Sequence, residues 1–244
     1  MNVLTLLVCT LWYVVFMKDN FSRHSALYSK FRPGYPKELF DFLIPLVREK
    51  KIAWDCGTGS GQVAFKLSEY FDEVHASDIS ANQIANAIHK DNIYYSLVSA
   101  EETLYTKNKF DLVTVGQAIH WFNFENFFSE VNRTLKAGGC IAVFGYNIMQ
   151  IDKAMDNIIA EFYKVITGPY WDEERKYLDE NYETIPFPFN EIKAPVLTGK
   201  YNWELEQVIG YLNTWSAVQH YIKKNNENPI DIIYGQLQQA GVIL

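Results

Sequence analysis

The residues most able to do chemistry form one short run, Trp54-Asp55-Cys56-Gly57-Thr58-Gly59-Ser60-Gly61. The run follows Lys51-Ile52-Ala53 and precedes a helical pattern that opens at Gln62. Glycine at every second position allows positive φ and leaves no Cβ between the main chain and whatever lies against it. A helix that starts after such a turn presents unpaired N–H groups. The run therefore predicts a strand, a glycine turn and a helix built around a small charged ligand.

Spacing decides among three kinds of ligand loop. A G-x-G-x-x-G loop counted from Gly57 needs a third glycine at position 62, which is Gln62. A G-x-x-x-x-G-K-[ST] loop fails because no Gly-Lys-Ser/Thr follows. What remains is acid-x-G-x-G-x-G, with Asp55 two residues before the first glycine. A carboxylate there repels a pyrophosphate and attracts a cation. A sulfonium that carries an amino group is such a cation.

A second acid stands where a ribose would lie. The stretch from Glu73 to Ser77 predicts a short strand that ends in Asp78, about twenty residues after the first glycine. The same spacing occurs in nicotinamide enzymes, so Asp78 supports the fold more than the choice of cofactor. Ser80 and Gln83, three residues apart, form a capping-box pattern that marks the start of the next helix.

These motifs resemble those of the class I S-adenosylmethionine-dependent methyltransferases, and the resemblance runs from about Tyr28 to about Trp215. It implies S-adenosylmethionine as the cofactor, with Ile79 against the adenine, the turn at Ala100 and Glu101 at the adenine edge, and the backbone carbonyl of Gln117 at the amino group. The cofactor-binding residues that it implies are Asp55, Gly57, Gly59, Gly61, Asp78, Ile79, Ala100, Glu101 and Gln117. Gly59→Val is expected to abolish cofactor binding while leaving the fold largely intact.

The same resemblance and the hydrophobic pattern predict the fold. A fourth strand spans Phe110 to Val115, and a turn from Leu135 to Gly139 leads into a continuous apolar run typical of a doubly covered parallel strand. Five βα units give an α/β, doubly wound, Rossmann-like sheet of mostly parallel strands with helices on both faces. A sixth strand is expected from Ala194 to Trp203 and a helical stretch from Glu204 to Ile222. The family's final antiparallel strand is expected to be missing or truncated. Unless the last four residues, Gly241 to Leu244, or the leader fill its place, the fifth strand has an unpaired edge.

We expect three segments of one domain: an apolar leader at 1–18, the S-adenosylmethionine-binding core at 19–147, and a lid insertion, the sixth strand and C-terminal helices at 148–244. The uncharged stretch from Val3 to Met17 is shorter than the ~20 residues of a membrane-spanning helix. It lacks the basic leader and the cleavage site of a signal peptide. A non-native extension before Met17, a membrane or partner anchor, and packing on the domain all stay open.

Composition agrees with a cytoplasmic enzyme of one compact domain, and membrane association through the leader is the alternative. We expect a small-molecule substrate and a monomer or homodimer. The net charge of −7 argues against nucleic-acid partners, which select basic surfaces. The three cysteines, Cys9, Cys56 and Cys140, are odd in number and lie in apolar settings, so reduced thiols are expected. No Cys/His spacing suggests a metal site.

Several residues outside the cofactor motifs are candidates for binding or activating the methyl acceptor. Methyl transfer needs an aligned nucleophile and the exclusion of water. His120 follows the fourth strand and is the candidate catalytic base for an amine or hydroxyl acceptor, whereas a carboxylate acceptor needs no base; packing against Trp121 is its alternative role. Arg32 is suited to grip a carboxylate of the cofactor or of the substrate. The candidate substrate-binding residues are Arg32, Tyr28, Trp121, Tyr146 and Trp171.

Two aromatic segments, Gly168 to Arg175 and Ile185 to Phe189, are expected to form a lid; helix packing is the alternative. The stretches Tyr28 to Pro36, Gln117 to Phe122 and Thr214 to Ala217 resemble the small-molecule branch that includes trans-aconitate methyltransferases. Two functions stay open: a methyltransferase for a small metabolite, with a carboxylate as one candidate acceptor, or a catalytically silent fold that serves as a binding partner, with membrane tethering through the leader as one option. Titration with S-adenosylhomocysteine separates them.

Overall fold

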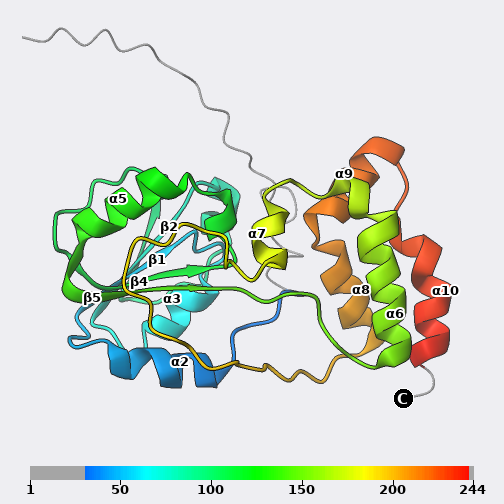
Figure 1. The fold of residues 1–244 in the computed structure, drawn as a ribbon, viewed down its shortest axis with the longest axis horizontal. Helices are drawn as coiled ribbons and strands as arrows, with labels where there is room; N and C mark the ends of the chain where they lie inside the picture. The colour runs from blue at the N-terminus through cyan, green and yellow to red at the C-terminus, as the bar shows by residue number, and fades with distance from the viewer. Residues whose placement is uncertain (1–30, 242–244) are drawn as a thin grey trace, which may run out of the picture.

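The computed structural model describes residues 31–241. Five parallel strands form one sheet in the order β3-β2-β1-β4-β5 (Figure 1). The strands are β1 (Ile52–Cys56), β2 (Glu73–Asp78), β3 (Ile93–Leu97), β4 (Phe110–Gly116) and β5 (Leu135–Phe144). The predicted doubly wound α/β fold is therefore confirmed.

Helices cover both faces of the sheet. They are α2 (Lys37–Leu43), η1 (Ile44–Leu46), α3 (Gln62–Leu67), α4 (Ala81–Ala85), η2 (Ile119–Trp121) and α5 (Phe124–Thr134). Helices α2 and α3 lie on one face and α5 on the other (Figure 1). The buried side chains of the central strand β1 alternate between these two cores, with Ala53 beneath α2 and α3 and Trp54 beneath α5. The strand was predicted from its place before the glycine turn, and its apolar side chains Ala53, Trp54 and Cys56 are fully buried in these two cores.

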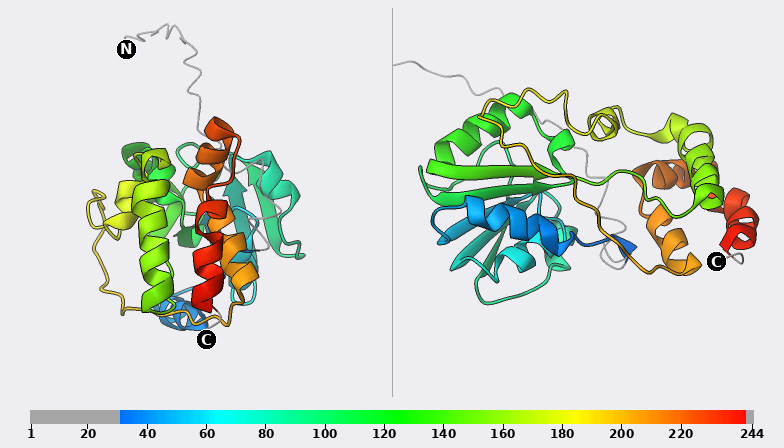
Figure 2. Two further views of the ribbon diagram at one scale, coloured as in Figure 1. Left: turned by 90° about the vertical axis from the view of Figure 1, so that its right-hand side faces the viewer. Right: turned by 60° about the horizontal axis from the view of Figure 1, so that its bottom comes forward.

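The segments after β5 form a separate helical layer beyond the end of the sheet (Figures 1 and 2). It contains α6 (Lys153–Glu161), the π-helical turn η3 (Phe162–Ile166), η4 (Gly168–Tyr170), α8 (Leu205–Asn213), α9 (Ser216–Asn225) and α10 (Ile230–Gly241). A short helix, α7 (Arg175–Asp179), lies between this layer and the sheet (Figure 1). The layer has its own apolar core, which includes Phe162, Leu212, Trp215 and Leu237.

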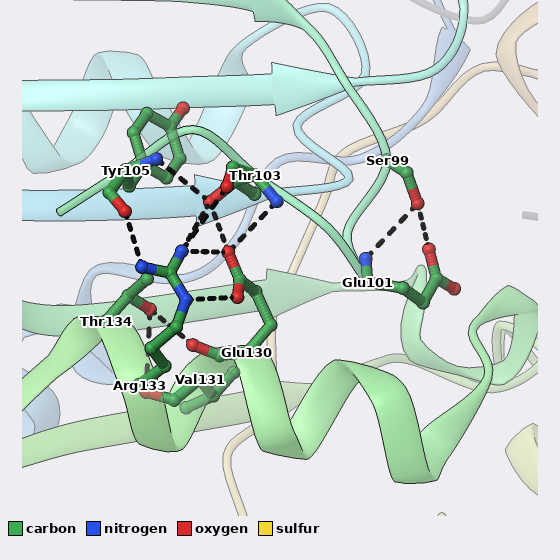
Figure 3. Close-up of polar contacts among 8 residues, drawn as sticks. All are labelled: Ser99, Glu101, Thr103, Tyr105, Glu130, Val131, Arg133 and Thr134. Atoms are coloured by element: carbon green, nitrogen blue, oxygen red, sulfur yellow. Dashed lines mark hydrogen bonds and ion pairs between the residues drawn. The ribbon is translucent and has the colours of Figure 1, made fainter. Parts of the chain in front are cut away.

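Polar contacts fix the segment after β3 to α5 (Figure 3). Glu130 accepts hydrogen bonds from the Thr103 N–H at 3.0 Å and from two guanidinium nitrogens of Arg133, at 2.6 and 2.7 Å. Arg133 also donates to the carbonyl oxygen of Tyr105 at 2.6 Å. Burial alone raises the pKa of Glu130, but the hydrogen bonds from Arg133 and Thr103 outweigh burial and hold that pKa below its usual value. We call Thr103, Tyr105, Glu130 and Arg133 the Glu130 network.

The glycine turn predicted from Leu135 to Gly139 lies inside strand β5. Pairing with β4 passes from Phe110 opposite Leu135 directly to Leu112 opposite Cys140. Residues 136–139 therefore bulge out of the ladder, and Gly138 has a φ of 80°. Glycine tolerates this left-handed conformation at little cost.

The predicted sixth strand is wrong. Residues 190–203 form neither helix nor strand. Pro195 has no N–H to donate to a ladder. Val196 is 97% exposed, whereas its neighbour Leu197 packs on the core beneath α2 and α3, so the segment is held by single side chains and not by strand pairing. The helical stretch predicted after it is two helices, α8 and α9, separated at Thr214 and Trp215.

No helix within residues 31–241 is long and apolar enough to cross a bilayer. The same residues contain no cluster of three or more metal-ligating side chains. Three predictions lie outside the described residues. They are the leader from Val3 to Met17, the reduced thiol of Cys9 and the candidate substrate residue Tyr28.

Candidate active site

A cleft opens at the carboxyl edge of the sheet, where the loops after β1 and β4 meet. This edge is where open α/β sheets bind ligands. Its lining residues are Arg32, Tyr35, Asp55, Gly57, Thr58, Gly59, Ser60, Gln62, Val63, Gly116, Gln117 and Tyr146. Six of the predicted site residues are therefore brought together here: Arg32, Asp55, Gly57, Gly59, Gln117 and Tyr146.

The three glycines of the loop, Gly57, Gly59 and Gly61, all have left-handed φ values, but the space beside their Cα atoms differs. A Cβ on Gly57 would lie 2.6 Å from the Ala118 Cβ, and one on Gly61 would lie 2.1 Å from the Tyr95 hydroxyl oxygen. At Gly59 the nearest atom is the Gln83 Oε1, at 4.0 Å. Protein atoms thus require glycine at 57 and 61, whereas Gly59 keeps the open side of the loop free for a ligand.

Asp55 ties the loop to its surroundings. Its carboxylate accepts hydrogen bonds from the Thr58 hydroxyl at 2.5 Å, the Ala64 N–H at 3.0 Å and the Thr114 hydroxyl at 2.8 Å. Burial raises the pKa of Asp55 to about 6, while these hydrogen bonds limit the rise. The N-cap residue of α3, Gly61, offers no side-chain cap, so Asp55 serves an orphan donor of the first turn. Asp55 lines the cleft and also has this structural task, and its contact with the cofactor stays a prediction.

The acid at the end of β2 lies against the same loop. Asp78 accepts the Gly59 N–H at 2.8 Å and the Ser80 N–H at 2.9 Å. The following residue, Ile79, is 40% exposed. Asp78 and Ile79 thus lie beside the glycine loop, and their contacts with a ribose and an adenine stay a prediction.

The turn after β3 is less open to a ligand. Ala100 is buried. One carboxylate oxygen of Glu101 accepts the Asn123 N–H at 3.0 Å, and the other accepts the Ser99 hydroxyl (Figure 3). The Glu101 acid thus holds the turn itself.

Gln117 occupies a strained position after β4. Its φ is 57°, which a residue other than glycine seldom adopts. Its Nε2 donates to the Tyr146 carbonyl at 2.8 Å, but its buried Oε1 accepts no hydrogen bond from any described residue. Backbone strain and an unsatisfied buried acceptor are features of functional sites.

Arg32 reaches the cleft from the chain before α2. Its Nη1 donates to the Tyr146 hydroxyl and its Nη2 to the Thr214 carbonyl, both at 3.3 Å. Its guanidinium carbon lies 5.3 Å from the centre of the Tyr211 ring. Arg32 is therefore oriented by the helical layer while lining the same cleft as the glycine loop.

His120, the candidate base, lies in η2 and is buried. Its Nδ1 is 3.1 Å from the Tyr182 hydroxyl, and its ring centre is 4.9 Å from that of Trp121. Burial, followed by the charges of Arg175 and Arg32, lowers the pKa of His120 to about 3. The imidazole is thus neutral at pH 7 and a weak proton acceptor, which favours the packing role over the base.

The two predicted lid segments are not among the residues that line the cleft, and their contacts favour helix packing, the alternative role. Trp171 packs in the helical layer, 4.9 Å from the Tyr163 ring and 5.5 Å from the Trp215 ring. Phe187 and Phe189 lie on Phe128 of α5, at 5.4 and 5.9 Å between ring centres. Both segments pack on helices because their aromatic side chains find apolar partners there.

Comparison with known proteins identifies the family. A model of the methyltransferase domain matches residues 54–143. A Dictyostelium discoideum protein named as a methyltransferase is 34% identical over 226 residues, which cover 91% of this chain and 86% of that protein. The chain belongs to the class I S-adenosylmethionine-dependent methyltransferases.

Two further relatives agree with this assignment. A solved structure from Anaeromyxobacter dehalogenans, assigned as a type II methyltransferase, superposes with a TM-score of 0.79 at 34% identity over 86% of this chain and 90% of that one. An S-adenosylmethionine-dependent methyltransferase assigned in Saccharomyces cerevisiae is 28% identical over 70% of this chain, which spans 60% of that protein. S-adenosylmethionine is the cofactor of this methyltransferase.

Several residues of the methyltransferase cleft were not predicted. They are Tyr35, Thr58, Ser60, Gln62, Val63 and Gly116. Thr58 and Ser60 alternate with the loop glycines, and that alternation could have revealed them. Tyr35 could not be placed from the sequence, because its hydroxyl reaches Gly116 only in the folded chain, 2.8 Å from where a Cβ would lie.

The dependence of turnover on pH between about pH 5 and 8 is expected to be the same in wild type and in His120→Asn, because His120 loses its proton near pH 3. Asp55, whose pKa is about 6, titrates in this range in both proteins. A base with the ordinary histidine pKa of about 6.5 would make turnover rise across this range. The pH profiles of wild type and His120→Asn check this. A rise in wild type that disappears in His120→Asn would contradict it.

Proposed function

We propose that this methyltransferase methylates a carboxylate of a small metabolite. When bound, S-adenosylmethionine supplies a methyl group made electrophilic by its sulfonium. A carboxylate acceptor is already a nucleophile at neutral pH and has no proton to lose, which suits a site in which His120 is a weak base. The observation that carries the proposal is the position of Arg32, whose guanidinium lines the same cleft as the glycine loop. Guanidinium geometry matches that of a carboxylate.

The residues of the cleft and the neighbouring end of β2 fit the cofactor. Gly59 leaves the open side of the loop free, and Asp78, which accepts the Gly59 N–H, is placed to accept hydrogen bonds from the ribose hydroxyls. Ile79 is exposed where the adenine is expected. The left-handed φ of Gln117 supports its carbonyl as the acceptor for the amino group. Contacts of Ala100 and Glu101 with the adenine edge stay a prediction.

Arg32 has a second possible ligand, the carboxylate at the methionine end of the cofactor, and Arg32→Gln separates the two. If Arg32 holds the acceptor, the variant keeps its affinity for S-adenosylhomocysteine, and the KM of the acceptor rises roughly tenfold, as expected for the loss of one charged hydrogen bond. If Arg32 holds the cofactor, affinity for S-adenosylhomocysteine falls while affinity for 5′-methylthioadenosine, which lacks the amino-acid end, stays unchanged. Isothermal titration with both ligands decides between them. Arg48→Gln, an exposed arginine at the opposite edge of the sheet, is the control.

The reaction itself is tested with methyl-labelled cofactor and a panel of small acids, phenols and amines. A methyl ester releases labelled methanol in alkali, whereas methyl ethers and methylamines are stable. The proposal requires alkali-labile label on at least one acid. Label found only in alkali-stable products would overturn it. Within residues 31–241 no contact favours the alternative of a silent binding partner.

A further inference from the structure

Gln83 is a buried polar side chain that the site described so far does not use. It lies in α4 and is 2% exposed. Its Oε1 accepts no hydrogen bond from any described residue. Buried acceptors without partners are rare in native structures, and each one calls for an explanation.

The sequence predicted a local partner for this amide, and the structure shows why it is absent. In a capping box the Gln83 side chain would accept the N–H of Ser80. The Ser80 N–H instead donates to Asp78 at 2.9 Å. The reciprocal half of the box is present, since the Ser80 hydroxyl accepts the Gln83 N–H at 3.3 Å. Asp78 has thus displaced the Gln83 side chain from its usual role.

The displaced amide lies at the open side of the glycine loop. Its Oε1 is 4.0 Å from the position that a Cβ on Gly59 would take, and no other atom is as near to that position. The Gly59 N–H donates to Asp78 at 2.8 Å. Gly59 therefore has the Asp78 carboxylate at its amide and the Gln83 Oε1 on its side-chain face.

We propose that Gln83 is a cofactor-binding residue whose Oε1 accepts a hydrogen bond from one hydroxyl of the cofactor ribose, while Asp78 accepts one from the other. A ribose carries two adjacent hydroxyl donors, and Asp78 and Gln83 are two acceptors on the same side of one loop. Each oxygen of Asp78 already accepts one backbone N–H, so a second acceptor relieves the carboxylate of holding both hydroxyls. Gln83 thus makes recognition of the intact diol depend on two residues.

The test combines removal of a ligand hydroxyl with removal of the amide. Gln83→Met keeps the length of the side chain and fills the same space without the acceptor. Binding of S-adenosylhomocysteine and of its 2′-deoxy and 3′-deoxy analogues is measured by isothermal titration for wild type and variant. Wild type is expected to bind each analogue roughly tenfold more weakly, and Gln83→Met to bind S-adenosylhomocysteine roughly tenfold more weakly. The variant is expected to be insensitive to loss of one of the two hydroxyls.

A merely structural role gives a different pattern. If Gln83 only packs α4 against the loop, Gln83→Met stays sensitive to both hydroxyls, or binds S-adenosylhomocysteine like wild type, and either result overturns the proposal. Asn82→Met removes an exposed amide from the same helix and is the matched control. Its affinities are expected to equal those of wild type. Thermal unfolding of the unliganded variants shows that each still folds.

Discussion

Gly59→Ala is expected to weaken binding of S-adenosylhomocysteine roughly ten- to a hundredfold in a protein that still folds. A methyl group there meets no protein atom closer than 4.0 Å, so it projects into space left for the cofactor. Overpacking of this kind costs about 1–3 kcal/mol. The left-handed φ of 56° adds about 1–2 kcal/mol to the folding cost of any residue with a Cβ. A β-branched valine is strained further at this φ. We therefore expect Gly59→Val to lose stability as well as affinity, and Gly59→Ala is the variant that tests affinity alone.

Gly61→Ala is the contrasting change, because its Cβ would lie 2.1 Å from the Tyr95 hydroxyl oxygen. It is expected to lower the free energy of unfolding by about 2–5 kcal/mol, the sum of the clash and the backbone strain. Gly138→Ala is the matched control, since Gly138 has a φ of 80° with no atom within 4 Å of the added Cβ and lies in the β5 bulge. Its stability falls by the backbone cost alone, and its affinity is unchanged. Urea denaturation measures the free energy of unfolding, and isothermal titration measures the affinity for S-adenosylhomocysteine.

Unchanged affinity in Gly59→Ala would show that the open side of the loop does not face the cofactor.

Glu130→Gln is expected to lower the free energy of unfolding at pH 7 by about 1.5–3 kcal/mol, because the charged hydrogen bonds of the Glu130 network lose their negative partner. The pKa of Glu130 is lowered in the folded protein, so the folded state binds fewer protons than the unfolded state in this range. The stabilisation is complete above the unfolded pKa of about 4.5 and is lost as the pH falls through the lower folded pKa.

Urea denaturation from pH 7 down to pH 3 measures this effect. The difference between wild type and Glu130→Gln should shrink over the acid part of the range. Asp41→Asn removes one partner of the exposed Lys37–Asp41 pair, whose side chains are 71% and 50% exposed. It is expected to change stability little, as surface pairs usually do. A difference at pH 7 no larger than that of Asp41→Asn would argue against a stabilising role for the Glu130 network.

The features predicted correctly from the sequence are those with local physical causes. The loop from Gly57 to Gly61 needs left-handed backbone at fixed spacing, and the position of Asp78 follows from the length of one helix and one strand. The strands buried on both faces read as apolar runs. These signals need no knowledge of distant partners.

The features that were missed depend on tertiary partners. The segment with Pro195 and Val196 looked like a strand, yet no core lies beneath Val196 to hold it. The lid aromatics found partners on α5 and in the helical layer, which the sequence could not place. Gln83 was predicted to cap the helix by accepting the Ser80 N–H, but in the structure this N–H donates to Asp78. The low pKa of His120 arises from burial and from two arginines distant in the chain, Arg32 and Arg175.

The few residues before α2 join the two halves of the cleft. Phe31 lies so close to Gly210 of α8 that a Cβ there would be 2.3 Å from its ring, and Arg32 is anchored on Tyr146 and Thr214. Tyr35 holds the other side by packing on Phe144 of β5, 4.8 Å between ring centres. With the role proposed for Arg32, substitutions in α8 and in the turn after it would change which acceptors are methylated without changing the glycine loop. Such change must be accompanied by compensating substitutions at Phe31 and Arg32, so these positions and α8 are expected to diverge together among paralogues.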